Sequence, residues 1–378
     1  MFYSGSPQTC TVGVGILTEV PDGPCYLVGM TSSELKELAV GMGEKPFRGA
    51  QLADWIYRKA VLNFEEMTNL PAAFIAQLQE AGITPTPLRV VDHRRSTDDV
   101  DKLLMDAGDG NVFESVLLPY EDRVSCCLSS QVGCPMGCTF CATGLGGFTR
   151  NLTAGEIVGQ YLALQSLSPR RVSHVVFMGM GEPLLNYDNL LAAIRLLHDE
   201  VKLSLRHITV STVGLVTGIE RLAKEEMPIH LALSLHSPLD DVRDRLMPVN
   251  QKWPVQVVVQ AMRDYHAITG RKVTFEYLLI HEVNDTPEQA DALADLVKGL
   301  PCVVNLIPFN YVDTEHGFAR PHRERVRQFK GRLAGRGVNV TERVERGHDI
   351  AAACGQLAGQ HQGKFARRGG VTSLPVSS

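Results

Sequence analysis

The 378-residue sequence lacks an apolar run of the roughly 18 residues that a membrane-spanning helix requires. Its first residues, MFYSGSPQTCTVGVG, also lack a basic stretch followed by a long apolar one, so we expect neither a signal peptide nor a membrane anchor. These absences predict a cytoplasmic protein whose thiols stay reduced. Its nine cysteines then indicate metal or redox chemistry rather than structural disulfides.

A strong excess of positive charge is also missing. The net charge of −5 argues against a protein that coats nucleic acid indiscriminately. One stretch, RPHRERVRQFKGRLAGR at 320–336, is nevertheless basic, and Arg323, Arg327 and Lys330 fall on one side of it at helical spacing. Either this stretch contacts a specific RNA or it is a solvated helix face, and the sequence leaves both interpretations open.

Residues 31–82 carry the signals of a small helical unit. Thr31 and Glu34 form a capping-box pattern at its start. Asn69 is the expected cap of a later helix, and Gly82 is expected to end that helix. The charged residues at 92–101 predict a boundary turn after this unit.

A predicted hairpin, with its turn at Asp109–Gly110, leads into a regular alternation of strands and helices. Two of the helices begin with capping-box patterns, Thr153 with Glu156 and Thr217 with Glu220. Repetition of strand and helix predicts parallel β–α units, so we expect an α/β barrel or partial barrel, with a doubly wound open sheet as the alternative. The predicted strands lie near 124–129, 173–178, 207–212, 229–236, 272–280, 302–308 and 338–344, and the helices at 153–167, 188–199, 217–224, 255–267, 287–298 and 321–334.

The strand IHLALSLHS at 229–237 indicates which of its two faces lines the interior of the barrel. Its leucines face one way, towards packed helices, whereas Ala232, Ser234 and His236 face the other way and leave room for a ligand. In parallel barrels the site lies at the carboxyl ends of the strands.

Three cysteines, Cys134, Cys138 and Cys141, follow the first of these strands with C-x3-C-x2-C spacing. A structural zinc site normally has four ligands, commonly from two C-x2-C pairs, and this sequence has no second pair. An iron–sulfur cubane held by three thiolates keeps one iron open to a substrate. Unligated buried cysteines are the remaining interpretation, but the glycine- and proline-rich loop around them disfavours it.

The C-x3-C-x2-C loop resembles the signature of the radical S-adenosylmethionine (SAM) enzymes. The segments CLSSQVGCPMGCTFCATGLGGFTRNL, MGMGEPLLN, LSLHSP, NLIPFN and ERGHDIAAACGQLAG together resemble the bacterial adenine-C2 methyltransferases of 23S ribosomal RNA and tRNA. The resemblance runs from about residue 30 to about residue 365. It implies a partial parallel (β/α)6-type barrel with a small N-terminal helical domain.

The resemblance also implies the cofactor sites. Cys134, Cys138 and Cys141 would hold one [4Fe–4S] cluster per chain. Taken alone, Glu182 could be a surface carboxylate and Asn310 a turn residue. The residues that would contact S-adenosyl-L-methionine are Gly181, Glu182, Ser211, Ser234, Leu235, His236 and Asn310.

Three further residues receive catalytic roles through the same resemblance. Cys354 would carry the methyl group, Cys127 would resolve the product from it, and Glu114 would act as the base. The strand around Glu114 would leave it partly buried, although a solvated edge carboxylate is the alternative. Alternation along a strand should turn the neighbouring Cys126 away from Cys127.

The implied activity is radical methylation of C2 of an adenine in the peptidyl transferase centre of 23S rRNA and of the adenine beside the tRNA anticodon. C8 methylation of the same rRNA adenine and a non-enzymatic zinc-binding RNA module are the alternatives. The implied partners are these RNAs and an electron donor such as a flavodoxin system, with no membrane and a monomeric chain. RNA contacts are expected from the basic stretch at 320–336 and from Lys45, Arg48, Arg58 and Lys59.

The expected domain division has five parts. They are an extension at 1–30, a helical RNA-binding domain at 31–95, a linker and hairpin at 96–123, the barrel at 124–365 and a flexible tail at 366–378. Cys10, Cys25 and Cys302 receive no role from the sequence.

Overall fold

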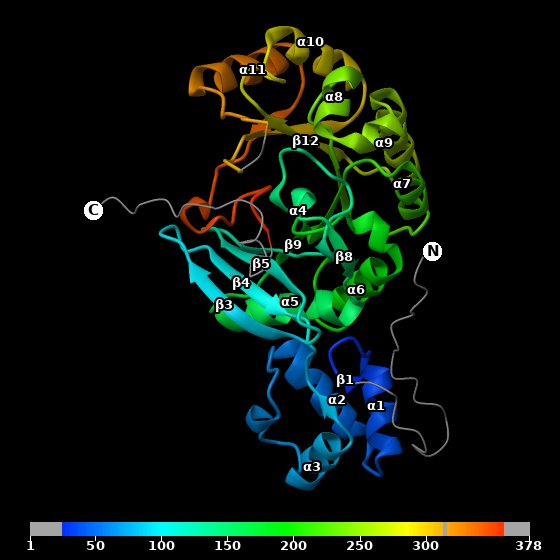
Figure 1. The fold of residues 1–378 in the computed structure, drawn as a ribbon. Helices are drawn as coiled ribbons and strands as arrows, with labels where there is room; N and C mark the ends of the chain where they lie inside the picture. The colour runs from blue at the N-terminus through cyan, green and yellow to red at the C-terminus, as the bar shows by residue number, and fades with distance from the viewer. Residues whose placement is uncertain (1–24, 313–315, 359–378) are drawn as a thin grey trace, which may run out of the picture.

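The computed structural model describes residues 25–312 and 316–358. Most of the predicted extension, the whole predicted tail and Cys10 lie outside these residues. The fold combines a large mixed sheet, helices that cover it, and a separate group of helices, α1 to α3, at one end of the molecule (Figure 1).

The large sheet has ten strands in the order β14-β13-β12-β11-β10-β9-β6-β5-β4-β3. Neighbours from β6 to β14 are parallel, and each connection moves one strand further in the same direction. A doubly wound sheet would reverse its strand order, so that alternative is wrong, and the partial barrel is confirmed. The parallel strands are β6 (Val124–Cys127), β9 (His174–Phe177), β10 (Ile208–Thr212), β11 (His230–Ser234), β12 (Val273–Leu279), β13 (Cys302–Pro308) and β14 (Val340–Glu342).

The predicted helices between these strands are also present, within a few residues of the expected ends. They are α5 (Ala154–Leu167), α6 (Tyr187–Asp199), α7 (Val216–Ala223), α9 (Val255–Thr269), α10 (Pro287–Leu296) and α11 (Arg323–Gly335). Four short elements near the site were not predicted: β7 (Gln131–Gly133), α4 (Ala142–Leu145), β8 (Phe148–Asn151) and α8 (Asp240–Leu246).

Three antiparallel strands extend the sheet beyond β6. They are β3 (Arg89–Arg95), β4 (Asp101–Asp106) and β5 (Val112–Pro119). The predicted hairpin is therefore confirmed, and in its turn the Asp109 carboxylate accepts a hydrogen bond from Asn111 N at 3.0 Å. The predicted boundary turn is wrong for residues 92–95, because cross-strand pairing with β4 draws them into β3.

The helical unit contains α1 (Ser32–Gly41), α2 (Pro46–Ala53), a π-helical turn (Asp54–Arg58), a 3-10 turn (Phe64–Glu66) and α3 (Ala72–Glu80). Two short parallel strands, β1 (Cys25–Tyr26) and β2 (Ile83–Thr84), close it. The capping box of Thr31 and Glu34 is confirmed. The cap predicted at Asn69 is wrong, because Pro71 occupies the cap position and the Asn69 amide oxygen accepts the Trp55 indole N–H instead.

The two capping boxes predicted in the barrel have different outcomes. Thr153 and Glu156 form both hydrogen bonds of a capping box at the start of α5. The pair Thr217 and Glu220 does not, because α7 begins earlier, with Leu215 as its cap residue, and Thr217 lies inside the first turn.

A buried arginine fixes the carboxyl ends of two central strands. The Arg243 side chain is fully buried, and its guanidinium donates to Leu235 O at 3.0 Å, Val213 O at 2.7 Å and Asn250 Oδ1 at 2.7 Å. Burial lowers the pKa of Arg243 to about 10. These bonds hold the loops after β10 and β11 at the edge of the sheet where the site was expected.

Substitution of Gly49 tests the packing of the helical unit. A Cβ at Gly49 would lie 2.2 Å from Leu35 O and 2.4 Å from Lys36 Cα, so Gly49→Ala must push α2 away from α1. We expect it to lower the free energy of unfolding by about 1–3 kcal/mol. Gly41→Ala is the matched control, since a Cβ at Gly41 meets nothing within 4 Å. Urea unfolding followed by circular dichroism measures both, and equal stabilities for the two variants would contradict the packing.

Candidate active site

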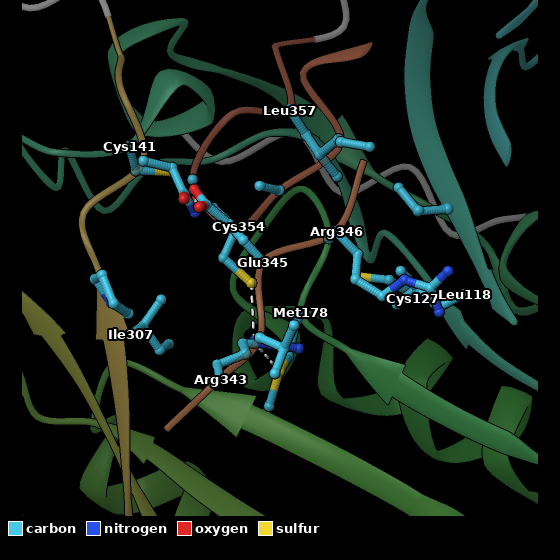
Figure 2. A pocket seen from close by; sticks show the side chains of 18 of the residues that line it. Leu118, Cys127, Cys141, Met178, Ile307, Arg343, Glu345, Arg346, Cys354 and Leu357 are labelled. Atoms are coloured by element: carbon cyan, nitrogen blue, oxygen red, sulfur yellow. Dashed lines mark hydrogen bonds between the residues drawn. The ribbon is translucent and has the colours of Figure 1, made fainter. Parts of the chain in front are cut away.

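A cleft opens at the carboxyl ends of the parallel strands, as the partial barrel predicts. Two adjoining hollows form it, and both are lined by Cys141, Met178, Asn310, Arg343 and Cys354. Figure 2 shows the hollow in which Cys354, Arg343 and Met178 lie together, with Cys127 in the wall nearer β5. We call the two hollows together the carboxyl-end cleft.

The three clustered cysteines lie on one loop between β7 and α4. Gly133, just before the loop, has φ +76°, and a Cβ there would meet Gly147 O at 2.0 Å, so only glycine fits. The loop is also closed by the bond from Cys134 N to Gly147 O at 2.7 Å. Burial raises the pKa of all three thiols, that of Cys134 to about 12.

This donor set fits an iron–sulfur cluster. Iron–sulfur clusters are held by cysteine thiolates, and Cys134, Cys138 and Cys141 lie within eight residues of one loop. Cys134 and Cys138 each feel the charge of Cys141. Within residues 25–312 and 316–358, no three His, Cys, Asp or Glu side chains are arranged to hold a single metal ion, so the zinc-binding alternative gains no support from the described part of the chain.

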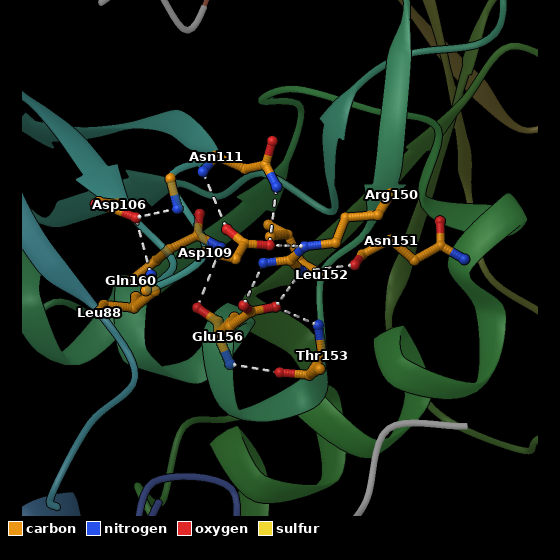
Figure 3. A network of polar contacts seen from close by, with 12 residues as sticks. Leu88, Asp106, Asp109, Asn111, Arg150, Asn151, Leu152, Thr153, Glu156 and Gln160 are labelled. Atoms are coloured by element: carbon orange, nitrogen blue, oxygen red, sulfur yellow. Dashed lines mark hydrogen bonds and ion pairs between the residues drawn. The ribbon is translucent and has the colours of Figure 1, made fainter. Parts of the chain in front are cut away.

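An ionic network centred on Arg150 of β8 lies next to the three-cysteine loop (Figure 3). Arg150 of β8 donates to both carboxylate oxygens of Glu156, at 2.8 and 2.9 Å, and to Asp109 in the β4–β5 turn at 2.7 Å. Because β8 pairs with β7, the network ties the cysteine loop to both α5 and the hairpin extension.

Gly181 and Glu182 lie where the sequence placed them. Gly181 has φ +102°, and a Cβ there would meet Gln131 Cβ at 2.6 Å. The Glu182 carboxylate is buried, lines the carboxyl-end cleft, and accepts bonds from Val213 N at 2.9 Å and Leu184 N at 3.0 Å. Burial raises the pKa of Glu182 to about 7. The surface-carboxylate interpretation is therefore wrong.

The residues predicted on β10 and β11 divide into two groups. Ser211, Ser234 and His236 line the carboxyl-end cleft, and the two serine hydroxyls lie 3.5 Å apart. Leu235 is fully buried and does not line the cleft, so any contact that it makes with a bound molecule must come from its backbone.

His236 has an unusual conformation and a fixed tautomer. Its φ of +60° lies in the left-handed region, which is uncommon for a residue with a side chain. Its Nδ1 accepts the Leu278 N–H at 3.0 Å, which places the proton of the neutral ring on Nε2. Burial, and then the positive charge of Arg243, lower the pKa of His236 to about 3. The imidazole therefore stays neutral at physiological pH.

Asn310 joins the cleft to the segment that carries Cys354. Its Nδ2 donates to Cys354 O at 3.1 Å. Its Oδ1 is buried and has no hydrogen-bond partner among the described residues, although it belongs to the cleft lining. An unsatisfied buried acceptor is costly, so a donor group on a bound molecule fits this position. The turn-residue interpretation does not account for it.

Cys354 and Cys127 share one hollow of the cleft although 226 residues separate them in the sequence. Cys127, the last residue of β6, is buried, and burial raises its pKa to about 12. Cys126 is fully buried and absent from the cleft lining, so the predicted alternation is confirmed.

Sequence reasoning missed Arg343. It follows β14 directly, and its Nη1 donates to Cys354 Sγ at 2.9 Å. Its position at the carboxyl end of a parallel strand is a signal that could have identified it, because the other cleft residues occupy corresponding positions.

Glu114 lies beside the Cys354 segment without lining the cleft. Its carboxylate pairs with Lys102 Nζ at 2.8 Å and accepts the Ala358 N–H at 2.7 Å. Both side chains of the pair are 8% exposed, so Glu114 is not a solvated edge carboxylate. Its expected role as a base is not tested by this geometry.

The basic residues at 320–336 are extensively paired with carboxylates. Arg332 on α11 and Arg336, which follows the last residue of that helix, bind Asp291 on α10 at 2.5 and 3.2 Å. Lys330 binds Glu342 at 3.4 Å. In the helical unit, Lys59 binds Asp54 at 3.1 Å and lies over the Trp55 ring.

No helix among the described residues is long and apolar enough to cross a membrane.

Comparisons with known proteins agree with this site. Residues 128–297 match the radical SAM superfamily, and residues 25–83 match the ribosomal RNA large subunit methyltransferase N-terminal domain. The chain is 46% identical over 350 residues to a probable dual-specificity RNA methyltransferase RlmN of Prochlorococcus marinus (strain MIT 9303), covering 91% of this chain and 98% of the relative. It is 48% identical over 351 residues to the protein of the same name from Symbiobacterium thermophilum, covering 90% and 93%.

A solved structure resembles the whole fold. The crystal structure of a radical SAM methyltransferase from Sphaerobacter thermophilus has a TM-score of 0.86 and 43% identity to this chain, covering 89% of this chain and 100% of the other. The fold and the three-cysteine loop thus define a radical SAM enzyme. Within that superfamily, the chain belongs to the RlmN family of dual-specificity RNA methyltransferases. Membership implies a [4Fe–4S] cluster, S-adenosylmethionine and an RNA substrate.

The low pKa of His236 predicts a pH-dependent stability. The unfolded chain takes up a proton on this histidine near pH 6.5, whereas the folded chain does so only near pH 3, so stability falls as the pH drops below 6.5. Between pH 7 and pH 5.5 the loss is about 1 kcal/mol. Urea unfolding of anaerobic preparations with equal iron content measures it.

His236→Asn is the control for this prediction. Asparagine tolerates a left-handed φ and can accept the Leu278 N–H, but it does not titrate. The variant should lose about 1 kcal/mol less than the wild type over the same pH range. Equal losses in the two proteins would show that His236 is not the group responsible.

Proposed function

We propose that this enzyme places a methyl group on C2 of an adenine in the peptidyl transferase centre of 23S rRNA and on the adenine beside the tRNA anticodon, through a methyl-cysteine at Cys354. The observation that supports the proposal is that Cys354, Cys127 and Cys141, the last cysteine of the three-cysteine loop, line one cleft. The printed names of the relatives, dual-specificity RNA methyltransferases, support the two classes of RNA substrate.

The cleft supplies a binding place for the two cofactors. Cys134, Cys138 and Cys141 would hold the [4Fe–4S] cluster as its three ligands. When bound, the cluster would supply one-electron reduction of S-adenosylmethionine, the chemistry from which a radical able to take a hydrogen atom from the methyl group on Cys354 would arise. Glu182, Ser211, Ser234, His236 and Asn310 would orient S-adenosylmethionine from the cleft walls, with Gly181 and the Leu235 backbone beside them.

The residues of this chain perform the remaining steps. C2 of adenine is electron-poor and does not attack a sulfonium, so Cys354 must deliver the methyl carbon as a radical that adds to the ring. Glu114 would then remove the C2 proton, which requires it to release Ala358 N, and the electron carrier oxidised in the first step would take back the unpaired electron of the adduct. The Cys127 thiolate would attack Cys354 Sγ to form a disulfide. The bond from Sγ to the methylene carbon would break with its electron pair on that carbon, which takes up a proton and becomes the methyl group of the product, and thiol reductants would restore both cysteines.

The setting of the reaction follows from the same proposal. The chain would act as a monomer in the cytoplasm, with electrons from a flavodoxin-type donor. The helical domain at 31–95 would bind RNA, and the target adenine would leave its stack to enter the cleft.

One experiment tests the activity directly. The anaerobic enzyme is incubated with methyl-labelled S-adenosylmethionine and unmodified 23S rRNA or tRNA, and the digested nucleosides are separated by mass spectrometry. We expect 2-methyladenosine from both RNAs. The appearance of 8-methyladenosine instead would establish the alternative regiochemistry.

Cys127→Ala should trap the enzyme on its RNA. The adduct in which a methylene group joins Cys354 to adenine forms, but no thiol can release it. The purified variant should therefore carry covalently bound RNA that survives denaturing electrophoresis. Cys126→Ala is the matched control, since that side chain faces away from the cleft and should turn over normally. A Cys127→Ala protein that is free of RNA and active would exclude Cys127 as the resolving residue.

A further inference from the structure

Arg343 contacts Cys354 in the carboxyl-end cleft, whose lining also includes Cys127 and Cys141. Its Nη1 donates to Cys354 Sγ at 2.9 Å, and Met178 Sδ lies 3.9 Å from the same nitrogen (Figure 2). Its backbone N donates to Leu306 O at 2.9 Å, which continues the pairing of β13 with β14. The guanidinium therefore extends from a fixed backbone position towards the sulfur.

The guanidinium has no carboxylate as its ion-pair partner. Within residues 25–312 and 316–358, no Asp or Glu oxygen lies within 4.0 Å of Arg343 in an ion pair. Glu276 is the buried carboxyl group whose charge Arg343 feels, but Glu276 Oε2 is occupied by Asn305 Nδ2 at 2.8 Å. Burial also raises the pKa of Glu276, which favours its neutral form.

The Arg343 guanidinium is partly exposed on the wall of the cleft, where it donates from Nη1 to Cys354 Sγ. The charge of Cys354 is the largest influence that raises the pKa of Arg343. A thiolate is a stronger acceptor than a thiol and carries the opposite charge, so a guanidinium in this position stabilises a thiolate more than a thiol.

We propose that Arg343 is a catalytic residue that holds Cys354 as a thiolate, so that its sulfur can accept the methyl group of S-adenosylmethionine. This inference rests on the proposed function, in which Cys354 is the methyl acceptor. The Cys354 proton leaves to solvent before the transfer. A sulfur lone pair then forms the new C–S bond, and the methyl–sulfonium bond breaks with its electron pair retained by the departing thioether. The negative thiolate and the positive sulfonium become two neutral thioethers, so no proton moves in the transfer itself.

The rate of alkylation of Cys354 tests the inference without any methyl transfer. Cluster-containing enzyme is treated anaerobically with iodoacetamide, and the peptide that carries Cys354 is quantified by mass spectrometry over time. We expect Arg343→Met to slow alkylation at pH 7 at least tenfold and Arg343→Lys, which keeps the charge, to slow it much less. Arg195→Met is the control, because Arg195 of α6 pairs with Glu225 and is not part of the cleft lining.

The pH dependence of the alkylation rate distinguishes an effect of the Arg343 charge from an effect on the access of iodoacetamide to Cys354 Sγ. If Arg343 acts through its charge, the rates of the wild type and Arg343→Met converge at high pH, where the thiol ionises unaided. A constant ratio at every pH would mean that the substitution only changes access to the sulfur, and equal rates at pH 7 would mean that Arg343 has no role; either result overturns the inference. Failure of the proposed function is distinguishable, because Cys354 would then stay unmethylated by S-adenosylmethionine in the wild type while the alkylation rates still differ.

Discussion

The site depends on how the backbone around Cys354 is held. Residues 346–358 contain only one short 3-10 turn, His348–Ile350, so hydrogen bonds from other parts of the chain fix them. Lys102 Nζ donates to Ala351 O at 3.1 Å, and its partner Glu114 accepts from Ala358 N, so one buried ion pair grips both ends of the Cys354 loop. Three further bonds attach the part of the segment around Cys354: Ala142 N to Gly355 O at 2.8 Å, Asn310 Nδ2 to Cys354 O at 3.1 Å, and Thr143 Oγ1 to Leu357 O. Each bond comes from a residue next to the cysteine loop or just after β13. The position of the segment is therefore fixed relative to the cysteine loop and to the carboxyl end of β13.

The same attachment explains why the segment can also move. Most of its bonds are to backbone oxygens and nitrogens, and few apolar side chains anchor it; Ala352, Ala353 and Leu357 are its buried members. Segments with little buried apolar surface and many individual hydrogen bonds open at low free energy compared with a packed core. Under the proposed function, Cys354 would meet S-adenosylmethionine, an adenine and Cys127 in turn, and a segment held by separable bonds could do this while the strands remain fixed. Glu114 binds both Lys102 and Ala358 N. Loss of the hydrogen bond from Ala358 N would therefore release one end of the segment and would also leave one oxygen of the Glu114 carboxylate without this donor.

Sequence patterns identified the parts of the fold that arise from local periodicity. The seven parallel strands, the helices between them and the three-cysteine loop all follow from residues close together in the chain. The errors occur where tertiary contacts override local signals: Asn69 bonds to Trp55 instead of capping α3, and residues 92–95 join a strand because β4 offers them partners. Arg343 is marked in the sequence only by its place at the carboxyl end of β14. Its contact with Cys354 could not be predicted, because Cys354 lies in a segment with no periodic pattern. The catalytic and cofactor residues came from motif resemblance; of these, the cleft brings together Cys127, Cys141, Gly181, Glu182, Ser211, Ser234, His236, Asn310 and Cys354.

Cys127 and Cys354 line the same hollow, but their surroundings differ. Burial raises the pKa of Cys127 to about 12, and only the thiolate of a cysteine is an effective nucleophile. Cys354 Sγ accepts a hydrogen bond from the Arg343 guanidinium, whereas Cys127 feels Arg343 only as a weaker opposing influence on its pKa. The contact with Arg343 therefore favours Cys354 over Cys127 as the thiol that would accept a methyl group under the proposed function.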